Sequence, residues 1–312
     1  MSKPSGSGRS SGADRKRLII LAYKSKPQVV EALKVFRPWL EQRADVVGEW
    51  DTRGLNRDNA SELPEADLAV VLGGDGTMLA QARALIDRDL QLLGINFGKL
   101  GFLAEFTIDS VKANWESIVS GSCRTSRRMM LEVLVYPPGA PEWGDSPASM
   151  PPAVFQSVVM NDAVITAGPP YRMVEIELAI EPGESQSSAT TFIGDGVVVA
   201  TPSGSTAYNL AAGGPIVSPG VNGMCITAIC PYSLAARPIV AHASSEIWLG
   251  IRRANEGTEL VLDGQDTCQL VKQQQVLIKQ HSQRVHLLHN PDYHYWNMLA
   301  HKMHWAARPQ RG

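Results

Sequence analysis

The chain has 312 residues, of which 44% are hydrophobic, and its formal net charge is -2 at pH 7. That length and apolar content suffice for two domains with separate cores. The nearly balanced charge argues against a nucleic-acid-binding protein, which normally carries a broad basic surface, and no apolar run is long enough to span a membrane. The four cysteines form no C-x-x-C pair, as is typical of a reducing compartment. We therefore expect a cytoplasmic protein without a membrane or nucleic-acid partner.

The first half of the chain alternates short apolar runs with amphipathic segments. Residues 1–16 are rich in Ser, Gly, Lys and Arg and lack an apolar core, so we expect a flexible tail there and not a secretory signal. The alternation that follows indicates a parallel sheet covered by helices on both faces. It predicts strands over 17–23, 44–50, 68–72 and 92–96, helices over 27–42, 77–86 and 110–120, and a loop over 51–66.

The pattern changes near Arg128. Many short apolar runs separated by turn residues follow, and these are typical of a β-sandwich or a similar all-β layer. The proline-rich stretch 137–152 predicts an exposed hairpin loop, and 293–305 predicts a short amphipathic helix. The predicted strands cover 130–136, 154–159, 173–180, 190–193, 197–200, 223–229, 246–251, 259–262, 276–279 and 284–288.

The stretch Gly73-Gly74-Asp75-Gly76-Thr77 lies between a predicted strand and a predicted helix. Such a turn presents backbone N–H groups and the positive end of a helix dipole, and its glycines allow close approach of a phosphate and a positive φ. A carboxylate among phosphates repels them, so Asp75 is best explained as the acceptor of a hydroxyl proton during phosphoryl transfer. A tight turn with an aspartate at a strained position explains these five residues equally well.

Two later stretches also permit two interpretations. Residues 195–210 predict a strand, a turn rich in Ser, Thr and Gly, and a helix that begins near Thr206. They fit a well-capped short helix or a hydroxyl-lined nucleotide site. Asn161 and Asp162 follow an apolar run and fit either a turn or a pair that hydrogen-bonds a base edge and ribose hydroxyls.

Several familiar motifs are missing from the sequence. It contains no G-x-x-x-x-G-K-[ST] loop, and the glycines around Asp75 do not complete G-x-G-x-x-G. The second absence weakens a hydride-transfer function. Histidines cluster after residue 280 without a metal-binding spacing, so we assign no residue as a metal ligand.

Together these stretches resemble the NAD kinase family, the ATP-NAD kinases. The resemblance rests on Gly73–Thr77, Asn96–Phe106, Asn161-Asp162 and Asp195–Pro219. The Gly-Gly-Asp-Gly-Thr signal is shared with diacylglycerol, sphingosine and 6-phosphofructokinase types of kinase. The Thr-Pro-Ser-Gly-Ser-Thr-Ala-Tyr run is much more particular to NAD kinases.

The resemblance implies a fold and an activity. The fold is an N-terminal doubly wound α/β domain over 17–126, to which the segment 284–312 returns, and a C-terminal β-sandwich-like, NAD-binding domain over 127–283. The activity is transfer of the γ-phosphoryl group of ATP to the 2′-hydroxyl of the adenosine ribose of NAD, which gives NADP. A divalent cation, expected to be Mg²⁺, would accompany ATP. The family also implies a homo-dimer or homo-tetramer whose site is completed by a neighbouring subunit.

The resemblance assigns roles residue by residue. Asp75 matches the proton acceptor. Asp162 departs from the family's Asn-Glu pair and is one methylene shorter, so we expect a longer or water-bridged contact to the substrate there. The expected substrate-binding residues are Gly73, Gly74, Gly76, Thr77, Phe97, Asn161, Asp162, Arg172, Asp195, Thr206, Ala207, Tyr208, Asn209, Leu210, Ala211 and Gln265.

Other functions stay open at this point. A lipid or sugar kinase of the wider Gly-Gly-Asp-Gly group predicts a different acceptor pocket in the β-rich domain. A non-catalytic nucleotide sensor would tolerate loss of the Asp75 carboxylate.

Overall fold

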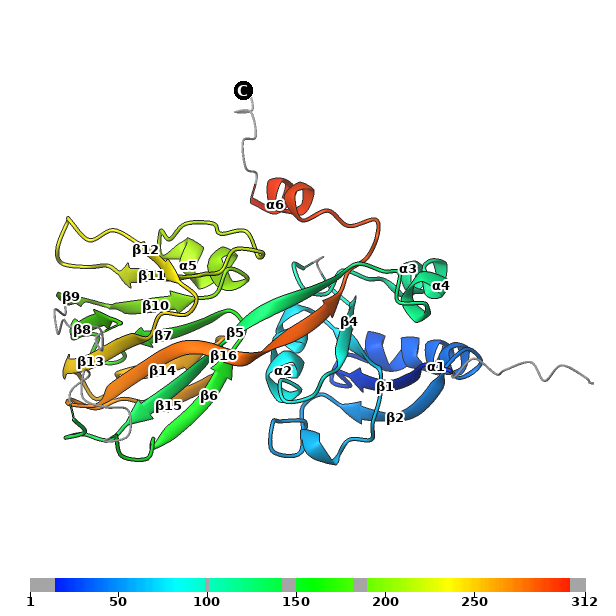
Figure 1. Ribbon diagram of the computed structural model, residues 1–312, viewed down its shortest axis with the longest axis horizontal. Coiled ribbons are helices and arrows are strands. Elements are labelled where there is room, and N and C mark those ends of the chain that lie inside the picture. The colour runs from blue at the N-terminus through cyan, green and yellow to red at the C-terminus, as the bar shows by residue number, and fades with distance from the viewer. Residues whose placement is uncertain (1–14, 99–100, 142–149, 182–189, 304–312) are drawn as a thin grey trace, which may run out of the picture.

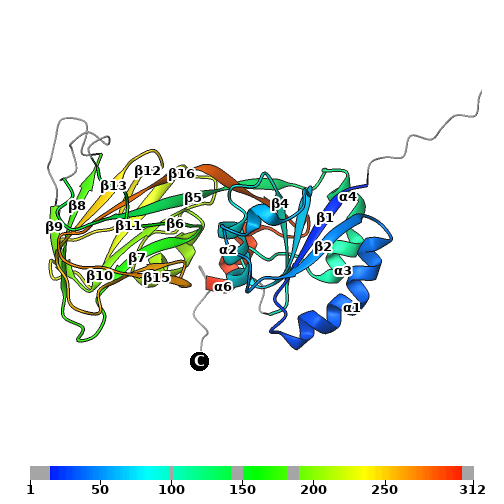
Figure 2. The ribbon, with the colours of Figure 1, turned by 90° about the horizontal axis from the view of Figure 1, so that it is seen from below.

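The computed structural model describes residues 15–98, 101–141, 150–181 and 190–303. The predicted tail, the predicted loop 137–152 and the end of the predicted C-terminal helix lie wholly or partly outside these residues. The described strands form a ten-stranded sheet and a six-stranded sheet. Figures 1 and 2 show an α/β part and a β-rich part, which are connected by two long strands.

The α/β part is built on four parallel strands in the order β2-β1-β3-β4. Alternate residues of β1 pack on opposite faces: Ile19 and Leu21 face helix α2, while Leu18 and Ile20 face α1, α3 and α4. The prediction of a parallel sheet with helices on both faces is therefore confirmed. The elements are β1 (Arg17–Ala22), α1 (Pro27–Glu41), β2 (Asp45–Asp51), the 3₁₀ turn η1 (Ala60–Glu62), β3 (Leu68–Gly73), α2 (Asp75–Ala84), β4 (Gln91–Asn96), α3 (Ile108–Ala113) and α4 (Trp115–Val119).

Two predicted helices differ in their limits. The helix predicted to begin at Thr77 begins at Asp75, so Asp75 belongs to the first turn of α2. The helix predicted over 110–120 is two helices, because the chain leaves helical geometry at Asn114. The first of them is capped by Thr107, whose side chain accepts a hydrogen bond from the Ser110 N–H at 3.1 Å.

The β-rich part is a sandwich. Its second sheet has the order β12-β11-β10-β7-β14-β15. Val133 and Leu249 of the large sheet share one core with Ile165 and Val199 of the second sheet, as in two sheets packed face to face. The elements are β5 (Thr125–Tyr136), β6 (Phe155–Val159), β7 (Asp162–Thr166), β8 (Val174–Ile180), β9 (Thr190–Gly194), β10 (Gly196–Ala200), the 3₁₀ turn η3 (Gly204–Thr206), α5 (Tyr208–Ala211), β11 (Gly223–Ile229), β12 (Ile239–His242), β13 (Ile247–Arg253), β14 (Glu259–Leu262), β15 (Asp266–Gln269) and β16 (Gln275–Leu288).

Strand β16 corrects the prediction of two separate strands over 276–279 and 284–288. It is one strand that pairs with β5 along most of its length, with a register irregularity between Gln280 and Arg284. At its end, His286 and Leu287 pair in parallel with β4. The large sheet is therefore continuous between the two parts of the molecule (Figure 1).

After β16 the chain forms α6 (Tyr295–Met303). Strands β7, β12 and β15 were not predicted, and each is only four or five residues long. The partners of β7, which are β10 and β14, lie far along the chain, whereas β12 and β15 each pair with the strand that precedes them. None of the helices in the described ranges has the length and apolar character needed to cross a membrane.

Candidate active site

The turn between β3 and α2 lies where the parallel strands end at their carboxyl edge, the usual ligand side of such a sheet. The Phe97 N–H donates to the Gly73 carbonyl oxygen at 2.7 Å, which joins the ends of β4 and β3. A Cβ added at Gly73 would lie 2.3 Å from Thr77 Oγ1, so Gly73 allows this close packing. The Phe97 side chain packs against the core on the α1 side of the sheet.

The positive φ that these glycines permit is not adopted. Gly73, Gly74 and Gly76 are not among the positive-φ glycines of the described residues, and Gly74 is extended at φ -152°. A Cβ added at Gly74 would meet its nearest neighbouring atom at 3.9 Å, and one added at Gly76 at 3.7 Å. These glycines thus leave space beside the N-terminus of α2, which an approaching phosphate can use.

The Asp75 carboxylate is held by three consecutive backbone amides. Oδ2 accepts a hydrogen bond from the Phe102 N–H at 2.7 Å, and Oδ1 accepts from Leu103 at 3.1 Å and from Ala104 at 3.0 Å. A Cβ at Gly101 would lie 1.7 Å from Oδ1, so only glycine fits beside this carboxylate. Because each carboxylate oxygen has two lone pairs, one acceptor position, on Oδ2, has no donor among the described residues.

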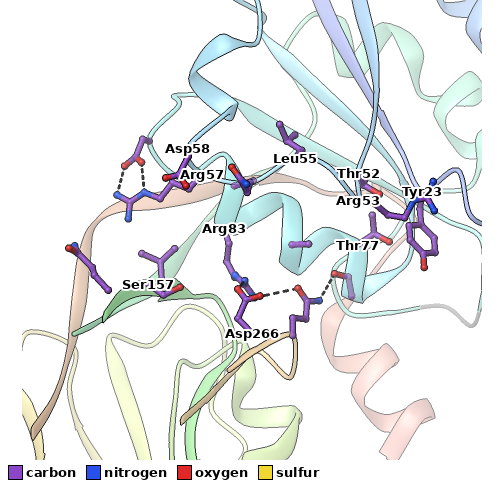
Figure 3. Close-up of a pocket in the computed structure, with 18 of the residues that line it drawn as sticks. Tyr23, Thr52, Arg53, Leu55, Arg57, Asp58, Thr77, Arg83, Ser157 and Asp266 are labelled. Carbon is purple, nitrogen blue, oxygen red and sulfur yellow. Dashed lines mark hydrogen bonds and ion pairs between the residues drawn. The ribbon is translucent and has the colours of Figure 1, made fainter. Parts of the chain in front are cut away.

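A cleft of about 1380 Å³ runs from this turn between α2, the loop after β2 and the β-rich part (Figure 3). Three of its cations have a carboxylate partner: Arg53 pairs with Asp51, Arg57 with Asp87, and Arg83 with Asp266. The lining includes Tyr23, Lys26, Thr52, Arg53, Leu55, Asn56, Arg57, Asp58, Gly76, Thr77, Arg83, Ser157, Gln265 and Asp266.

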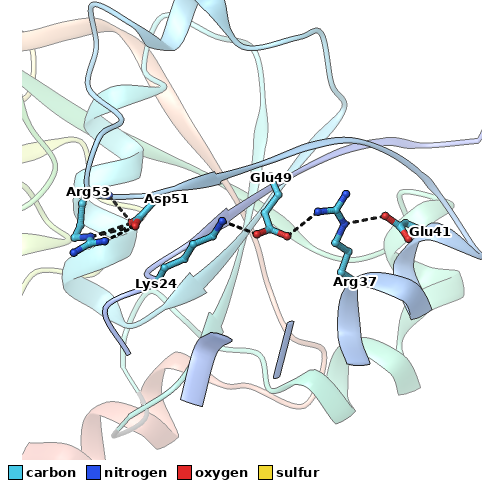
Figure 4. A network of polar contacts seen from close by, with 6 residues as sticks. All are labelled: Lys24, Arg37, Glu41, Glu49, Asp51 and Arg53. Carbon is cyan, nitrogen blue, oxygen red and sulfur yellow. Dashed lines mark hydrogen bonds and ion pairs between the residues drawn. The ribbon is translucent and has the colours of Figure 1, made fainter. Parts of the chain in front are cut away.

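Two lysines after β1 differ in their electrostatic surroundings. Lys24 Nζ lies 2.7 Å from Glu49 Oε1, and Glu49 also binds Arg37 (Figure 4). Burial alone would raise the pKa of Glu49, but its bonds from Lys24 and Arg37 outweigh that effect and lower it. Lys26 lines the cleft and has no carboxylate partner among the described residues. Its charge is therefore available to an anion.

Gln265 and Arg83 connect α2 to the turn between β14 and β15. Gln265 Nε2 donates to the Gly76 carbonyl oxygen at 2.7 Å, and Arg83 donates to Gln265 Oε1 at 3.4 Å. Burial lowers the pKa of Arg83, while the nearby Asp263 carboxylate opposes that effect. The expected contact residue Gln265 thus lies beside the glycines of the β3–α2 turn.

The backbone amides of Asn161 and Asp162 are held by the carboxylate of Asp263. Asp263 Oδ2 accepts from the Met160 N–H at 2.9 Å, and its Oδ1 accepts from Asn161 at 2.7 Å and from Asp162 at 3.1 Å. Asp162 is only 4% exposed, and its Oδ2 has no hydrogen-bond partner in the described part of the chain. Burial, reinforced by the Asp263 carboxylate, raises the pKa of Asp162 to about 7.

The turn after β10 packs directly on this pair. The Tyr208 backbone amide is near enough to Asp162 to oppose part of the rise in its pKa, and a Cβ at Gly204 would lie 2.1 Å from the Asn161 carbonyl oxygen. The helix expected near Thr206 is only the 3₁₀ turn η3 followed by the single turn α5. Thr206, Ala207 and Leu210 are half-buried, and Tyr208 and Ala211 are exposed.

Asn209 has a different environment from its neighbours. It is fully buried, and its amide donates to the carbonyl oxygens of Ser205 at 3.1 Å and Pro215 at 3.0 Å. Its Oδ1 accepts from Thr227 at 2.7 Å. These bonds fix the shape of the loop and use both donors of the buried Asn209 amide, so we expect its side chain to support the loop and not to donate to a substrate.

Asp195 and Arg172 lie away from the other expected site residues. Asp195 precedes β10, whereas Asp162 pairs with Ala200 at the other end of that strand. Five residues of antiparallel strand span about 17 Å. The Arg172 carbonyl oxygen accepts a bond from Asn255 at 2.7 Å, and Val174 pairs with Gly194 at the same end of the sandwich.

Sequence reasoning missed the cations of the cleft, namely Lys26, Arg53, Arg57 and Arg83. Most of them lie in loops that follow β1 and β2. Their position after parallel strands, at the ligand edge of the sheet, is the signal that could have identified them.

The chain matches two family models, the ATP-NAD kinase N-terminal domain over residues 27–123 and the ATP-NAD kinase C-terminal domain over 160–290. It is 37% identical to an NAD kinase of Geobacter metallireducens over 298 residues, which covers 94% of this chain and 100% of that protein. It is 34% identical to an NAD kinase of Laribacter hongkongensis, with 94% and 98% covered.

Two solved structures share the fold. A yeast NADH kinase complexed with NADH has a TM-score of 0.79 at 21% identity, and the match covers 96% of this chain and 91% of that one. An NAD kinase from Archaeoglobus fulgidus in complex with ATP has a TM-score of 0.68 at 20% identity, with 92% and 98% covered. The expected family and fold are confirmed, and the chain belongs to the ATP-NAD kinase family of phosphotransferases.

Proposed function

We propose that this chain phosphorylates the 2′-hydroxyl of the adenosine ribose of NAD with ATP, and that Asp75 accepts the hydroxyl proton. The observation that carries the proposal is the geometry of Asp75, which is fixed in the first turn of α2 by three amides. One acceptor position on Oδ2 stays available to a substrate hydroxyl. The relatives named NAD kinase support the reaction class.

ATP is proposed to occupy the cleft beside α2. The spaces at Gly74 and Gly76 suit phosphates at a helix N-terminus, and the uncompensated charge of Lys26 attracts them. Phosphoryl transfer depends mainly on alignment and charge neutralisation, which these groups supply. The neighbour from Archaeoglobus fulgidus, described in complex with ATP, supports this donor.

A divalent cation fits this site only as a companion of ATP. Among the described residues, no group of three or more His, Cys, Asp or Glu side chains could hold a metal ion. Mg²⁺ commonly binds through substrate phosphates and one or two carboxylates, and Asp58 is an exposed carboxylate of the cleft lining. The cation would neutralise phosphate charge during transfer.

The adenosine of NAD is proposed to lie against the Asn161-Asp162 turn and the segment Thr206–Tyr208. These segments contact each other, and Asn161 and Tyr208 retain exposed area there. Asp162 is almost completely buried, so its direct contact with a ribose hydroxyl is restricted and a water-bridged contact fits better. The neighbour complexed with NADH supports a dinucleotide as the acceptor.

We also propose that the protein acts as a homo-oligomer. Asp195 lies about 17 Å from Asp162 along β10, so the two would not contact the same adenosine within one subunit. Arg172 lies at the same end of the sandwich as Asp195. They could contribute to the site of a neighbouring copy. Mixing Asp75→Asn and Asp195→Ala subunits should restore activity that neither variant has alone. Activity no higher than that of the separate variants would contradict a shared site.

The direct test is an assay of purified protein with NAD, ATP and Mg²⁺, in which NADP is detected by an NADP-specific dehydrogenase. We expect NADP to form. NADP formation with polyphosphate but not with ATP would change the donor. Failure with both would favour a lipid or sugar kinase, and phosphorylation of those acceptors would then be measured. Nucleotide binding without any phosphoryl transfer would favour a sensor.

The phosphate site has its own matched test. Lys26→Ala removes a cation that has no carboxylate partner in the described part of the chain, and it should raise the KM for ATP by roughly tenfold, the equivalent of one charge-assisted hydrogen bond. Lys24→Ala is the control, because its charge is already paired with Glu49. Equal effects of the two substitutions would contradict a specific role for Lys26.

A further inference from the structure

The loop that clamps Asp75 is itself held from its other side by the segment after β16. Residues 101–105 supply the three amides to Asp75 and end in Glu105, which is 5% exposed. His289 Nδ1 lies 2.8 Å from Glu105 Oε1, and the Asn290 N–H donates to Oε2 at 3.2 Å. The Asn290 side-chain amide donates to the Glu105 carbonyl oxygen at 3.1 Å. One end of the loop is therefore fixed by a buried network.

The other end of the loop is fixed by a tyrosine. Tyr293 is 8% exposed, and its hydroxyl donates to the Gly101 carbonyl oxygen at 2.5 Å. Burial raises the pKa of Tyr293, so the hydroxyl stays protonated and remains a donor at neutral pH. Gly101 is the residue whose Cα lies against the Asp75 carboxylate. A shift of Gly101 would therefore change the position of Asp75 directly.

We propose that Glu105 and Tyr293 are positioning residues for Asp75, acting through the loop 101–105. This inference rests on the proposed role of Asp75 as proton acceptor. The two anchors lie on opposite sides of the three amides, so they determine where those amides point. The amides in turn determine which lone pair of Asp75 is left for the substrate hydroxyl. Positioning of this kind affects the transition state more than substrate binding.

Tyr293→Phe removes one anchor while keeping the shape of the ring. We expect kcat to fall by roughly tenfold, because small displacements of a catalytic group cost between tenfold and a hundredfold in rate. The KM for NAD should change by no more than about twofold, because the substrate contacts are untouched. Glu105→Gln, which disrupts the second anchor, should likewise lower kcat and leave the KM for NAD nearly unchanged.

A control separates positioning from general destabilisation. Tyr136→Phe alters another buried tyrosine, which is 9% exposed and stacks on Trp248 at the opposite end of β5. We expect its kcat to match that of the unaltered protein. If Tyr136→Phe and Tyr293→Phe lower kcat equally, or if Tyr293→Phe leaves kcat unchanged, the inference is wrong.

The deciding experiment combines Tyr293→Phe with Asp75→Asn. If Tyr293 acts through Asp75, its substitution lowers kcat in the unaltered protein but has little further effect on the residual rate of Asp75→Asn. Fully additive losses would overturn the positioning role while leaving Asp75 as the acceptor. A near-normal kcat for Asp75→Asn alone would instead overturn the proposed function, so the two failures are distinguishable.

Discussion

Two aspartates in different parts of the molecule have the same arrangement of hydrogen bonds. Asp75 in the α/β part and Asp263 in the β-rich part each accept three consecutive backbone N–H groups, two on Oδ1 and one on Oδ2. Their surroundings differ. Asp75 is half-buried in the first turn of α2, whereas Asp263 is 9% exposed and lies beside the buried Asp162.

The difference in exposure indicates how the same hydrogen-bonding arrangement can support either ligand binding or stability. A clamped carboxylate that is partly exposed has an acceptor position left for a ligand, as at Asp75. A buried carboxylate with the same three bonds, as at Asp263, satisfies backbone N–H groups whose burial without an acceptor would destabilise the protein. We therefore expect substitution of Asp75 to affect mainly catalysis, and substitution of Asp263 to affect mainly stability.

The largest expected effect is on the rate of Asp75→Asn. We expect kcat to fall by roughly 10²–10⁴, the range for loss of a general base, while NAD binding persists. Steady-state kinetics and a separate binding titration with NAD measure the two quantities. Asp109→Asn, an exposed carboxylate in α3, serves as the control and should leave kcat unchanged.

Asp263→Ala should mainly destabilise the protein. It leaves three backbone N–H groups without their acceptor, and each such buried group costs about 1–3 kcal/mol. We expect the free energy of unfolding in urea to fall by about 3 kcal/mol or more. Asp263→Asn keeps one acceptor oxygen and should lose less. A stable but inactive Asp263→Ala protein would contradict the division of roles between the two aspartates.

Asp162 should make the stability depend on pH. Its pKa is raised from 3.8 to about 7 in the folded state. The folded protein therefore keeps a proton that the unfolded chain has lost, and stability falls as the pH rises from about 4 through about 7. Asp162→Asn removes this dependence and should be more stable at pH 8 by on the order of 2–4 kcal/mol. Urea unfolding at pH 5 and pH 8 measures it, and parallel pH profiles for the two proteins would contradict the burial of this charge.

The smallest effect is expected at the connection between the two parts. Gln265→Ala removes the bond to the Gly76 carbonyl oxygen and should cost about 0.5–1.5 kcal/mol, seen as a several-fold rise in the KM for ATP. Gln269→Ala is a matched control on the same hairpin, since its amide donates at 2.7 Å to the Glu256 carbonyl oxygen. Equal KM values for the two variants would show that the bond does not support the cleft.

The local parts of this arrangement were predictable from the sequence. The apolar run before Gly73 and the helical pattern after Thr77 indicate a strand, a turn and a helix, because those signals lie within a few neighbouring residues. The alternation of elements and the later change to short strands likewise indicate the two parts of the fold.

The long-range parts were not predictable in this way. The amides that hold the Asp75 carboxylate lie 27 to 29 residues away, and the amides of residues 160–162 donate to the carboxylate of an aspartate more than 100 residues away. Two separate strands were predicted over 276–279 and 284–288, but pairing with β5 keeps β16 in one strand. Tertiary packing decides these features, and local sequence carries no signal for them.

The most direct test compares Asp75→Asn and Asp263→Asn in one set of measurements of kcat, NAD affinity and unfolding. The expected result is a loss of at least about a hundredfold in kcat for Asp75→Asn with NAD affinity preserved. For Asp263→Asn, the folded fraction should keep kcat within about tenfold of the unaltered value, with the main loss in stability. A near-normal kcat for Asp75→Asn, or equal losses of kcat in both variants, would contradict the assignment of Asp75 as the proton acceptor.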